Sequence, residues 1–313
     1  MASRGAPKIR WVPKSSVNRA LNALGDRWSL LVVQEAFLGA TRFEEFHALL
    51  GGARSTLSSR LAALERHGIL MKKPHRDEGA RMAYHLTPRG LGLFDSMMLM
   101  WGWGVRWGVT GGRAPTIFTH VDCGKAMLPE LRCGGCGELM TLHTCTFTPG
   151  PGEGMEKLPV QRMHRRRQPN DEAPTIELVD LLGDRWTALV VSVQYFGLHR
   201  FDEIQSMLGI ASNILTDRLR TLEMSGIFER RLYEITPPRY EYRLTKKGQD
   251  LYPHALAVMT WADTYLKDRA GPPVRIKHVC GEPLNAQVCC SACKGPLTLQ
   301  NVLMKAGRIK PTA

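Results

Sequence analysis

The sequence lacks an apolar run long enough to cross a membrane, because its richest apolar stretches, at 97–105 and 188–193, are short or interrupted by glycine and polar residues. The opening segment, MASRGAPKIRWVPKSS, has no apolar core of the kind that a secretory signal needs. The chain also has no phosphate-binding glycine loop, nucleophile elbow or paired-carboxylate motif. We therefore expect a cytoplasmic protein that is not an enzyme and does not enter a membrane.

Acidic residues are scarce relative to basic ones: 29 Asp and Glu against 42 Lys and Arg leave a net charge of +13. This excess favours a polyanionic partner such as DNA, RNA or an anionic membrane surface. With 313 residues, 43% of them hydrophobic, the chain is long enough for two domains with separate cores. Eight cysteines without an export signal indicate reduced thiols and metal binding rather than disulfides.

The chain contains one pattern twice. At an offset of 158 residues, the run GDRW at 25–28 falls on GDRW at 183–186, and Arg42 falls on Arg200. The same offset superposes a further set of identical residues, which includes Leu57 on Leu215, Arg60 on Arg218, Gly68 on Gly226, Tyr84 on Tyr242, Thr87 on Thr245 and Trp103 on Trp261. One fixed offset over so many positions indicates a tandem duplication.

Each copy contains a predicted helix-turn-helix, which is clearest at residues 200–226. Apolar residues at helical spacing mark its two helices: Phe201, Ile204 and Leu208 in the first, and Leu215, Leu219 and Leu222 in the second. The turn lies at 209–211, and Ser212 is a favourable N-cap for the second helix. The other face of that helix carries the hydrogen-bonding groups that a major-groove reader needs, namely Ser212, Asn213, Thr216, Asp217 and Arg220. An ordinary helical hairpin with a solvated face has the same pattern, so the flanking residues decide between the two.

The residues after Gly226 favour DNA reading. Apolar and basic side chains alternate at 227–233 and 239–244 around a turn at Pro237 and Pro238, which predicts a β-hairpin, and Thr245 then begins another helix. A reading helix followed by a basic hairpin is the plan of a winged helix-turn-helix, in which the hairpin contacts phosphate. Outside the reading helix, the predicted DNA contacts of this copy are Arg200, Arg230, Arg231 and Arg239.

In the first copy we predict one helix over 17–37, a helix-turn-helix over 42–67 with its turn at 51–53, and a wing with its tip at 77–79. The predicted DNA contacts are Arg42, Arg54, Ser55, Thr56, Ser58, Ser59, Lys72, Lys73, Arg76 and Arg81. Because the reading faces of the two copies differ, we expect different base preferences. Arg60 and Arg218 lie beside the leucine stripe, which favours a structural or phosphate-contacting role over base reading.

Thr87 followed by Pro88 predicts the start of a helix whose apolar face carries Met97, Met98 and Trp101. This face can serve core or subunit packing or line an effector pocket, and we favour packing.

These motifs, in this order, resemble the HxlR-type winged-helix regulators. The resemblance covers about residues 175–263 and rests on LLGDRW at 181–186, the reading helix, PPRYEYRLTKKG at 237–248 and Trp261. Through the duplication it extends to about residues 17–104. It implies a bacterial transcription factor that binds double-stranded DNA, and, because the family normally forms homodimers, two copies that pair within one chain. Further oligomerisation stays open, and no effector is indicated.

Several members of that family sense oxidants through a cysteine just before the first helix. Ser15 or Ser16 stands at that place in the first copy, and Ala173 or Pro174 in the second. The usual thiol-sensing route of the family is therefore not expected here.

Each copy ends in a cluster of metal-ligand residues: His120, Cys123, Cys133 and Cys136 in the first, and His278, Cys280, Cys290 and Cys293 in the second. A CxxC turn with a further Cys and a His suits tetrahedral Zn²⁺, so we predict two structural zinc sites, one from each cluster. The rivals for the fourth ligand are His143, Cys145 and Cys289. Thiol redox sensing and inert cysteines are the alternatives. A catalytic metal is not expected, because no general base accompanies the clusters.

The predicted fold is mainly α with small β wings: two winged helix-turn-helix modules, each followed by a small element like a zinc ribbon or knuckle. The expected divisions are a basic arm at 1–14, a module at 15–112, a cysteine element at 113–145, a linker at 146–172, a module at 173–270, a cysteine element at 271–300 and a tail at 301–313. A basic run at 164–167 in the linker is either a DNA contact or a solvated segment. The predicted function is sequence-specific transcription regulation, with a non-specific nucleic-acid or protein-interaction scaffold as the alternative.

Overall fold

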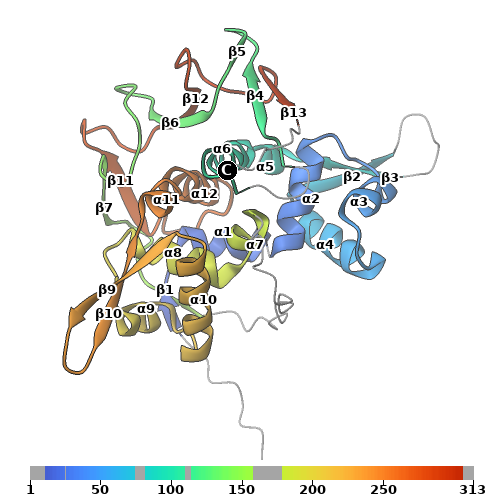
Figure 1. Ribbon diagram of the computed structural model, residues 1–313. Helices are drawn as coiled ribbons and strands as arrows, with labels where there is room; N and C mark the ends of the chain where they lie inside the picture. Colours follow the sequence, from blue (N-terminus) through green and yellow to red (C-terminus); the bar gives the residue numbers. More distant parts are fainter. Residues whose placement is uncertain (1–10, 25, 75–81, 110–113, 158–177, 306–313) are drawn as a thin grey trace, which may run out of the picture.

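The computed structural model describes residues 11–24, 26–74, 82–109, 114–157 and 178–305. The predicted class is confirmed: helices dominate, and short antiparallel strand pairs accompany them. Across the described ranges, no helix has the length and apolar character needed to span a membrane. Figure 1 shows a central group of helices with a winged module at each side and a layer of strands above them.

The helices of the first half are α1 (Ser16–Leu24), α2 (Arg27–Phe37), α3 (Phe43–Leu50), α4 (Arg54–Arg66), α5 (Pro88–Leu91) and α6 (Phe94–Trp107). The prediction of one helix over 17–37 is wrong, because α1 and α2 are separate. Asp26 causes the break: its extended backbone and its side chain, which accepts the N–H of Ser29 at 3.1 Å, start a new helix. Thr87 caps α5 as predicted, by accepting the N–H of Gly90 at 3.1 Å.

The second half repeats this order with α7 (Leu178–Leu182), α8 (Arg185–Gln194), α9 (Phe201–Leu208), α10 (Ser212–Met224), α11 (Lys246–Gln249) and α12 (Tyr252–Tyr265). Asp184 caps α8 through the N–H of Thr187 at 2.8 Å, as Asp26 caps α2. The predicted capping role of Ser212 is wrong. Gly209 is left-handed with φ of 58°, and after this tight turn Ala211 already has the extended cap geometry, so Ser212 is the first helical residue.

Each module carries the predicted wing. In the first half, β2 (Leu70–Pro74) pairs antiparallel with β3 (Met82–Leu86), and in the second, β9 (Phe228–Glu234) pairs with β10 (Arg239–Leu244). The turn of the second wing, 235–238, contains both predicted prolines. The tip of the first wing, 77–79, lies outside the described residues.

The other strands join the two halves. Three strands of the first half, β4 (Ile117–His120), β6 (Pro129–Cys133) and β7 (Cys145–Pro149), pair antiparallel with β13 (Val302–Lys305), β12 (Ala286–Cys290) and β11 (Val274–His278) of the second, in that order. A short strand, β5 (Lys125–Ala126), extends β4. The expectation of a separate cysteine element behind each module is therefore wrong. Residues 117–149 and 274–305 form one structure, which we call the cysteine body.

Strand pairing also corrects the ends of three predicted segments. Residues 146–149 and 155–157 of the expected linker lie in strands β7 and β8, and β8 (Met155–Lys157) pairs with β1 (Trp11–Pro13) from the expected arm. Residues 302–305 of the expected tail form β13. These segments have strand partners far away in the sequence, which a local pattern does not indicate.

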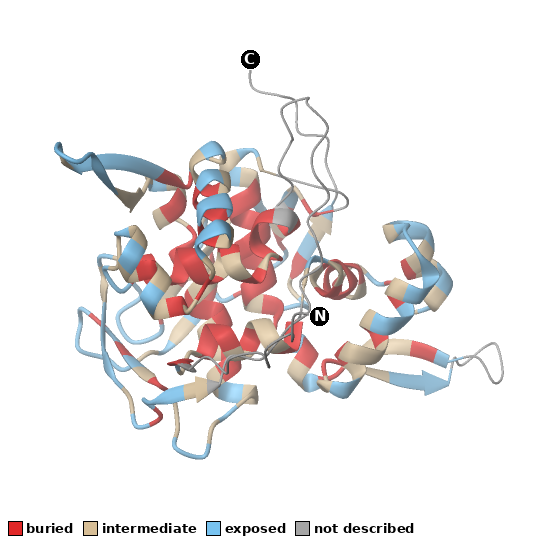
Figure 2. Ribbon diagram, turned by 90° about the horizontal axis from the view of Figure 1, so that it is seen from below, coloured by how far each residue is buried: buried red, intermediate tan, exposed pale blue. Residues whose placement is uncertain are grey.

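The halves pack along central helices. α1 lies against α12 of the other half, where Arg19 Nη2 is 2.9 Å from Asp263 Oδ1. α6 and α12 contact each other, and His254 donates from Nδ1 to the carbonyl oxygen of Ser96, its equivalent position in the first half, at 2.9 Å. Met97, Met98 and Trp101 are fully buried, which confirms core packing for the methionine and tryptophan face. Figure 2 shows the buried residues gathered on these central helices and the exposed ones on the wings.

Candidate DNA-reading helices and metal centres

The second reading helix, α10, has one face buried in the module core and one face exposed to solvent. Leu215, Leu219 and Leu222 are buried in the module core, whereas the predicted base-reading residues Ser212, Asn213, Thr216, Asp217 and Arg220 are exposed. Thr216 donates its hydroxyl to the carbonyl oxygen of Ser212 at 2.9 Å, and Asp217 pairs with Arg218. Asn213 is therefore the exposed amide at the start of the helix, which is where a reading helix contacts base edges.

The aspartate of each GDRW run fixes its reading helix. Arg218 is buried on α10 and donates from Nε to Asp184 Oδ2 at 2.6 Å, and Asp184 also caps α8. In the first half, Arg60 Nη2 lies 2.6 Å from Asp26 Oδ2. Both arginines are therefore structural groups: Arg218 joins α10 to the N-terminus of α8, and Arg60 joins α4 to the N-terminus of α2. Arg185 of the second GDRW run has another partner, since it donates to Asn18 and Asn22 on α1 of the other half.

The first reading helix, α4, presents different chemistry. Arg54, Ser55, Ser58 and Ser59 are exposed, and Thr56 is half-buried. Arg54 is held by Glu44 on α3, with Nη1 2.8 Å from Glu44 Oε2, and its guanidinium lies 4.8 Å from the ring centroid of Phe43. This ion pair holds the pKa of Glu44 below its usual range. Arg54 must exchange this partner before it can contact DNA, which the sequence did not indicate.

Most basic residues of the wings also have acidic neighbours. Arg231 Nε donates to Glu229 Oε1 at 2.8 Å, Arg239 Nε lies 3.3 Å from Glu234 Oε2, and Arg230 Nε lies 3.6 Å from Glu223 Oε1. In the first wing, Lys72 Nζ lies 3.1 Å from Glu65 Oε2, and Lys73 is exposed. Because exposed ion pairs contribute little free energy, phosphate can replace these carboxylates at small cost.

Two predicted contacts, Arg42 and Arg200, lie at the start of α3 and α9. Glu45 accepts backbone N–H groups of Thr41 and Arg42, which lowers the pKa of its carboxyl to about 2, and Glu203 accepts the N–H of Arg200 at 3.0 Å. The Arg200 guanidinium lies 4.4 Å from the ring centroid of Tyr233 on the wing. Arg76 and Arg81 lie outside the described residues, as does the basic run at 164–167.

The cysteine body gathers all eight predicted metal-ligand residues into two groups. The first group is His120, Cys123, Cys290 and Cys293, and the second is Cys133, Cys136, His278 and Cys280. Within each group, every pair of ligand atoms lies within 4.8 Å. His143, Cys145 and Cys289 belong to neither group. The expectation that each site comes from one copy is wrong, because each group takes a His and a Cys from one half and a CxxC pair from the other.

The distances within the groups suit a tetrahedral ion. The Sγ atoms of Cys123 and Cys290 are 4.0 Å apart, and His120 Nδ1 is 3.2 Å from Cys293 Sγ. In the second group, Cys133 Sγ is 3.9 Å from Cys280 Sγ, and His278 Nδ1 is 3.4 Å from Cys136 Sγ. Zn–S bonds of about 2.3 Å and Zn–N bonds of about 2.0 Å place sulfur ligands about 3.8 Å apart and sulfur–nitrogen pairs about 3.5 Å apart.

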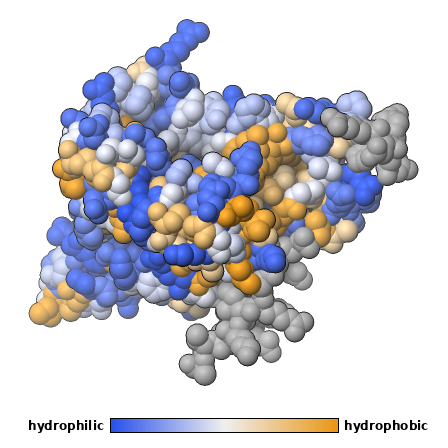
Figure 3. All heavy atoms as spheres, turned by 90° about the horizontal axis from the view of Figure 1, so that it is seen from above, coloured by the Kyte–Doolittle hydropathy of each residue, from blue (hydrophilic) through white to orange (hydrophobic). Residues whose placement is uncertain are grey.

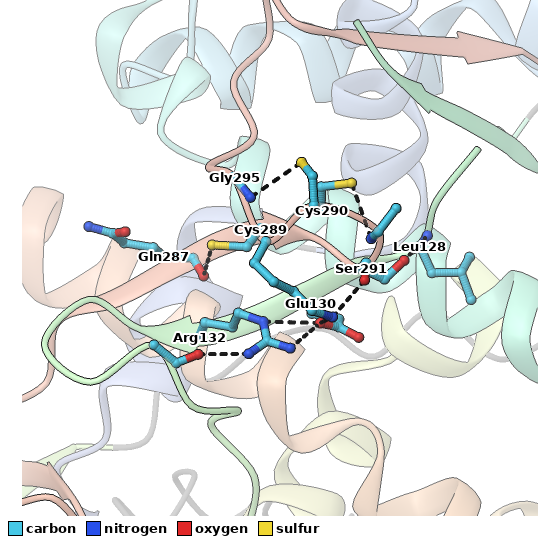
Figure 4. A network of polar contacts seen from close by, with 12 residues as sticks. Leu128, Glu130, Arg132, Gln287, Cys289, Cys290, Ser291 and Gly295 are labelled. Atoms are coloured by element: carbon cyan, nitrogen blue, oxygen red, sulfur yellow. Dashed lines mark hydrogen bonds and ion pairs between the residues drawn. The ribbon is translucent and has the colours of Figure 1, made fainter. Parts of the chain in front are cut away.

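The CxxC turns supply amide donors to sulfur. In the second half, the N–H groups of Ala292 and Gly295 point to Cys290 Sγ and Cys293 Sγ at 3.3 and 3.4 Å, and Figure 4 shows this turn beside the Glu130–Arg132 pair of β6. In the first half, backbone N–H groups of Cys136 and Gly135 lower the pKa of the Cys133 thiol. Such donors favour the thiolate, which is the form that binds metal.

Both histidines present Nδ1 to sulfur and bury Nε2. Nε2 of His120 lies 3.1 Å from Asp122 Oδ2, but neither Nε2 atom has a hydrogen-bond partner within the described part of the chain. In both histidines Nδ1 is the nitrogen that faces the sulfur atoms of the group, so it is the nitrogen placed to bind a metal. The residues present therefore fit a divalent ion with sulfur and nitrogen ligands.

Each cluster residue was visible in the sequence, but the grouping was not. The Cys-to-CxxC spacing predicts one local site, whereas the residues between the single Cys and the CxxC include an extended strand, β6 or β12. A cue was the difference between the copies: His120 and Cys123 are three residues apart, and His278 and Cys280 two. Each group takes its His–Cys pair from one half and its CxxC pair from the other. The His-to-Cys spacing of a half therefore does not have to fit the CxxC turn of the same half.

A helix-turn-helix whose second helix is anchored to the N-terminus of the helix before the motif, followed by a β-hairpin wing and present twice, defines a tandem winged helix-turn-helix protein. The chain belongs to the HxlR-like helix-turn-helix family, which matches residues 23–111 and 181–270, together more than half of the chain. It is a family of transcription regulators, not of enzymes.

Curated relatives share one module-length region or more. An uncharacterized HTH-type transcriptional regulator of Mycobacterium tuberculosis is 38% identical over 130 residues, which are 41% of this chain and 82% of the relative. The regulator YvaP of Bacillus subtilis is 38% identical over 89 residues, 28% of this chain and 82% of the relative. The first alignment is longer than either family match, so that likeness continues beyond a winged module.

Solved structures also match part of this chain in sequence. The transcription-factor candidate PA1607 is 33% identical, with 44% of this chain and 94% of that chain covered and a TM-score of 0.37. The reduced transcriptional regulator YodB of B. subtilis is 38% identical, with 27% of this chain and 83% of that chain covered and a TM-score of 0.25.

Proposed function

We propose that this protein is a sequence-specific transcription regulator that reads double-stranded DNA with α4 and α10. The observation that carries the proposal is the orientation of α10. Its leucines and Arg218 are held inside the module, and the exposed side chains of Asn213, Thr216 and Asp217 lie on the opposite face, where they can meet base edges. The basic wing residues would contact phosphate, in keeping with the net charge of +13.

The two modules are proposed to act as a pair within one chain. The cross-half contacts of α1, α6 and α12 support this, because they join the halves through buried side chains as a dimer interface would. Two linked modules have a high effective concentration toward each other, so the pair should persist on dilution. Since Ser55 stands where the second reading helix has Asn213, the two half-sites should differ in sequence.

We further propose that both cysteine–histidine groups hold zinc in a structural role. The donor set of three sulfurs and one imidazole nitrogen supports Zn²⁺ over hard ions such as Mg²⁺ or Ca²⁺, which prefer oxygen. A structural ion supplies folding free energy to the turns that hold its ligands. Because zinc-bound thiolates are shielded from oxidants, this role also ranks above thiol sensing.

Selection of DNA from a random library, followed by footprinting at the chromosome, tests the regulator function. A regulator located with the bacterial chromosome in the cytoplasm should enrich one asymmetric site with two protected segments. Binding without a preferred sequence would instead support a nucleic-acid or protein-interaction scaffold. Light scattering should show one chain per particle at nanomolar dilution, and an obligate dimer with a perfectly palindromic site would contradict the intrachain pair. Metal analysis under reducing conditions tests the zinc assignment.

A further inference from the structure

We propose that the two metal ions form an interlock between the halves: each ion needs ligands from both halves, and filling both sites holds the two modules in one relative position. The inference rests on the zinc sites of the proposed function. It adds that the ions control the geometry of the DNA-reading pair, in addition to stabilising local turns.

The first step is the reciprocal exchange of ligands. His120 and Cys123, at the end of β4 and in the turn after it, face the Cys290–Cys293 turn that follows β12. In return, His278 and Cys280, at the end of β11 and beyond it, face the turn at 133–136 that follows β6. Both sites have three thiols and one imidazole, so that each of them has a complete tetrahedral ligand set.

The strand register explains why a half cannot fill a site by itself. β6 and β12 are antiparallel, with Cys133 opposite Ala286 and Cys290 opposite Pro129, so the two CxxC turns begin at opposite ends of one ladder. Four residue steps along β6 separate Pro129 from Cys133, which is about 13–14 Å in an extended strand. Cys123 lies at the Pro129 end, near Cys290, and a shared metal ion cannot span the strand to Cys133.

The cysteine body is joined to the helices that carry both modules. At Gly102 on α6, an added Cβ would lie 2.5 Å from Pro129 Cγ, so that β6 sits directly on this helix. On the other half, the rings of Phe147 and Phe196 meet edge to face with centroids 4.6 Å apart, and Phe196 follows α8. Holding the two sides of the body together therefore restrains both modules.

The position of the body relative to the reading helices completes the argument. In Figure 1 the strands β4, β5, β12 and β13 lie above α6 and α12, and α4 and α10 lie below them. Figure 3 looks onto the strand face, where hydrophobic residues gather between hydrophilic ones. The metal centres thus lie on the side away from the reading helices and leave those helices free for DNA. Their effect on DNA binding must act through the relative position of the halves.

Zinc content of paired double variants of the full chain distinguishes exchanged from local sites. Cys123→Ser with Cys293→Ser removes two ligands of one exchanged site, and the protein should retain one zinc ion per chain. Cys123→Ser with Cys133→Ser removes one ligand from each exchanged site, and the protein should retain none. Local sites predict the reverse, since Cys123 and Cys133 would then share an ion. That reverse result, or equal zinc contents in the two double variants, would overturn the interlock.

Cys145→Ser and Cys289→Ser are the matched controls, because both thiols lie in the cysteine body outside the two groups. Each control should retain the zinc content of the wild-type chain. If the wild-type protein contains no zinc, the zinc assignment itself is contradicted. If it contains zinc but the double variants show local sites, only the exchange of ligands between the halves is contradicted.

A distance measurement tests the control of geometry. Spin labels attached through an unnatural amino acid, which avoids the thiols, are placed at the exposed positions Ser59 on α4 and Asp217 on α10. The label–label distance distribution should be narrow with zinc and become broader or shifted after chelation, while circular dichroism keeps the helical signal. An unchanged distribution in zinc-free protein would overturn control of geometry by the ions. If the chain loses helicity after chelation, the zinc contents of the double variants still show whether the ligands are exchanged between the halves.

Discussion

Trp103 and Trp261, which occupy equivalent positions in the two halves, make the same hydrogen bond in opposite directions. The indole N–H of Trp103 donates to the carbonyl oxygen of Lys247 at 2.9 Å, and that of Trp261 donates to the carbonyl oxygen of Arg89 at 2.8 Å. Lys247 and Arg89 are themselves equivalent at the 158-residue offset. Residue i of one half contacts j of the other and the reverse, which is the mark of a two-fold interface.

Replacing either tryptophan with phenylalanine should therefore weaken the pairing of the halves. Each of Trp103→Phe and Trp261→Phe leaves a partly buried carbonyl without its indole donor, and should lower the free energy of unfolding by about 1 kcal/mol. Trp107→Phe is the matched control, because the buried indole nitrogen of Trp107 has no partner among the described residues. Urea denaturation measures all three. A loss for Trp107→Phe as large as for the other two would contradict the assignment.

The reading roles predict a contrast between base and phosphate contacts. Asn213→Ala should cost about 1–3 kcal/mol on the selected site and little on random DNA. Arg231→Ala should weaken binding to both DNAs alike and reduce the salt dependence. Affinities by fluorescence anisotropy at several salt concentrations compare the two variants.

Ser55→Ala is the control in the other half, since Ser55 is equivalent to Asn213. It should change preference at the opposite half-site only. Losses of equal size for Asn213→Ala and Arg231→Ala on both DNAs would disprove these roles.

The two GDRW aspartates should differ in their effect on stability. Asp184→Asn leaves Arg218, whose side chain is only 8% exposed, without its main counter-charge, although Asp217 remains beside it. We expect a loss of about 2–3 kcal/mol, below that of a fully broken buried pair. Asp26→Asn should cost about 1 kcal/mol, because Arg60 and Asp26 are 22% and 29% exposed and water screens their pair. Urea denaturation measures both variants. Equal shifts of the urea midpoint would show that the burial of the arginine does not determine the size of the stability loss.

Asp95, in the first turn of α6, predicts a pH effect. Burial raises the pKa of its carboxyl to about 6 from an ordinary value of 3.8. The folded state therefore binds the proton more tightly than the unfolded state, and ionisation costs stability as pH rises from about 4 through 6. Asp95→Asn should leave stability unchanged below pH 4 and raise it by about 1–3 kcal/mol above pH 6. The free energies of unfolding of the two proteins are compared between pH 4 and pH 6. A difference between them that stays constant over this range would contradict the prediction.

Much of each module could be predicted from the sequence because its interactions are local. The leucines at Leu215, Leu219 and Leu222 define a helix face by spacing alone, and a wing follows from alternation around Pro237 and Pro238. The 158-residue repeat then carried the same parts to the first half. The motif pattern likewise identifies all eight cysteine and histidine residues of the two groups, since CxxC turns are specific even in an isolated sequence.

Only the tertiary structure determined which residues become partners in a metal site or an ion pair. Cys123 and Cys133 are near in sequence, but the extended strand β6 keeps them apart, and the antiparallel register with β12 brings Cys290 to Cys123 instead. Glu44 lies one helix before Arg54, and only the packing of α3 against α4 pairs them. A sequence determines local geometry through spacing and propensity, whereas partners across two halves depend on a pairing that is settled when the cores of both halves come together.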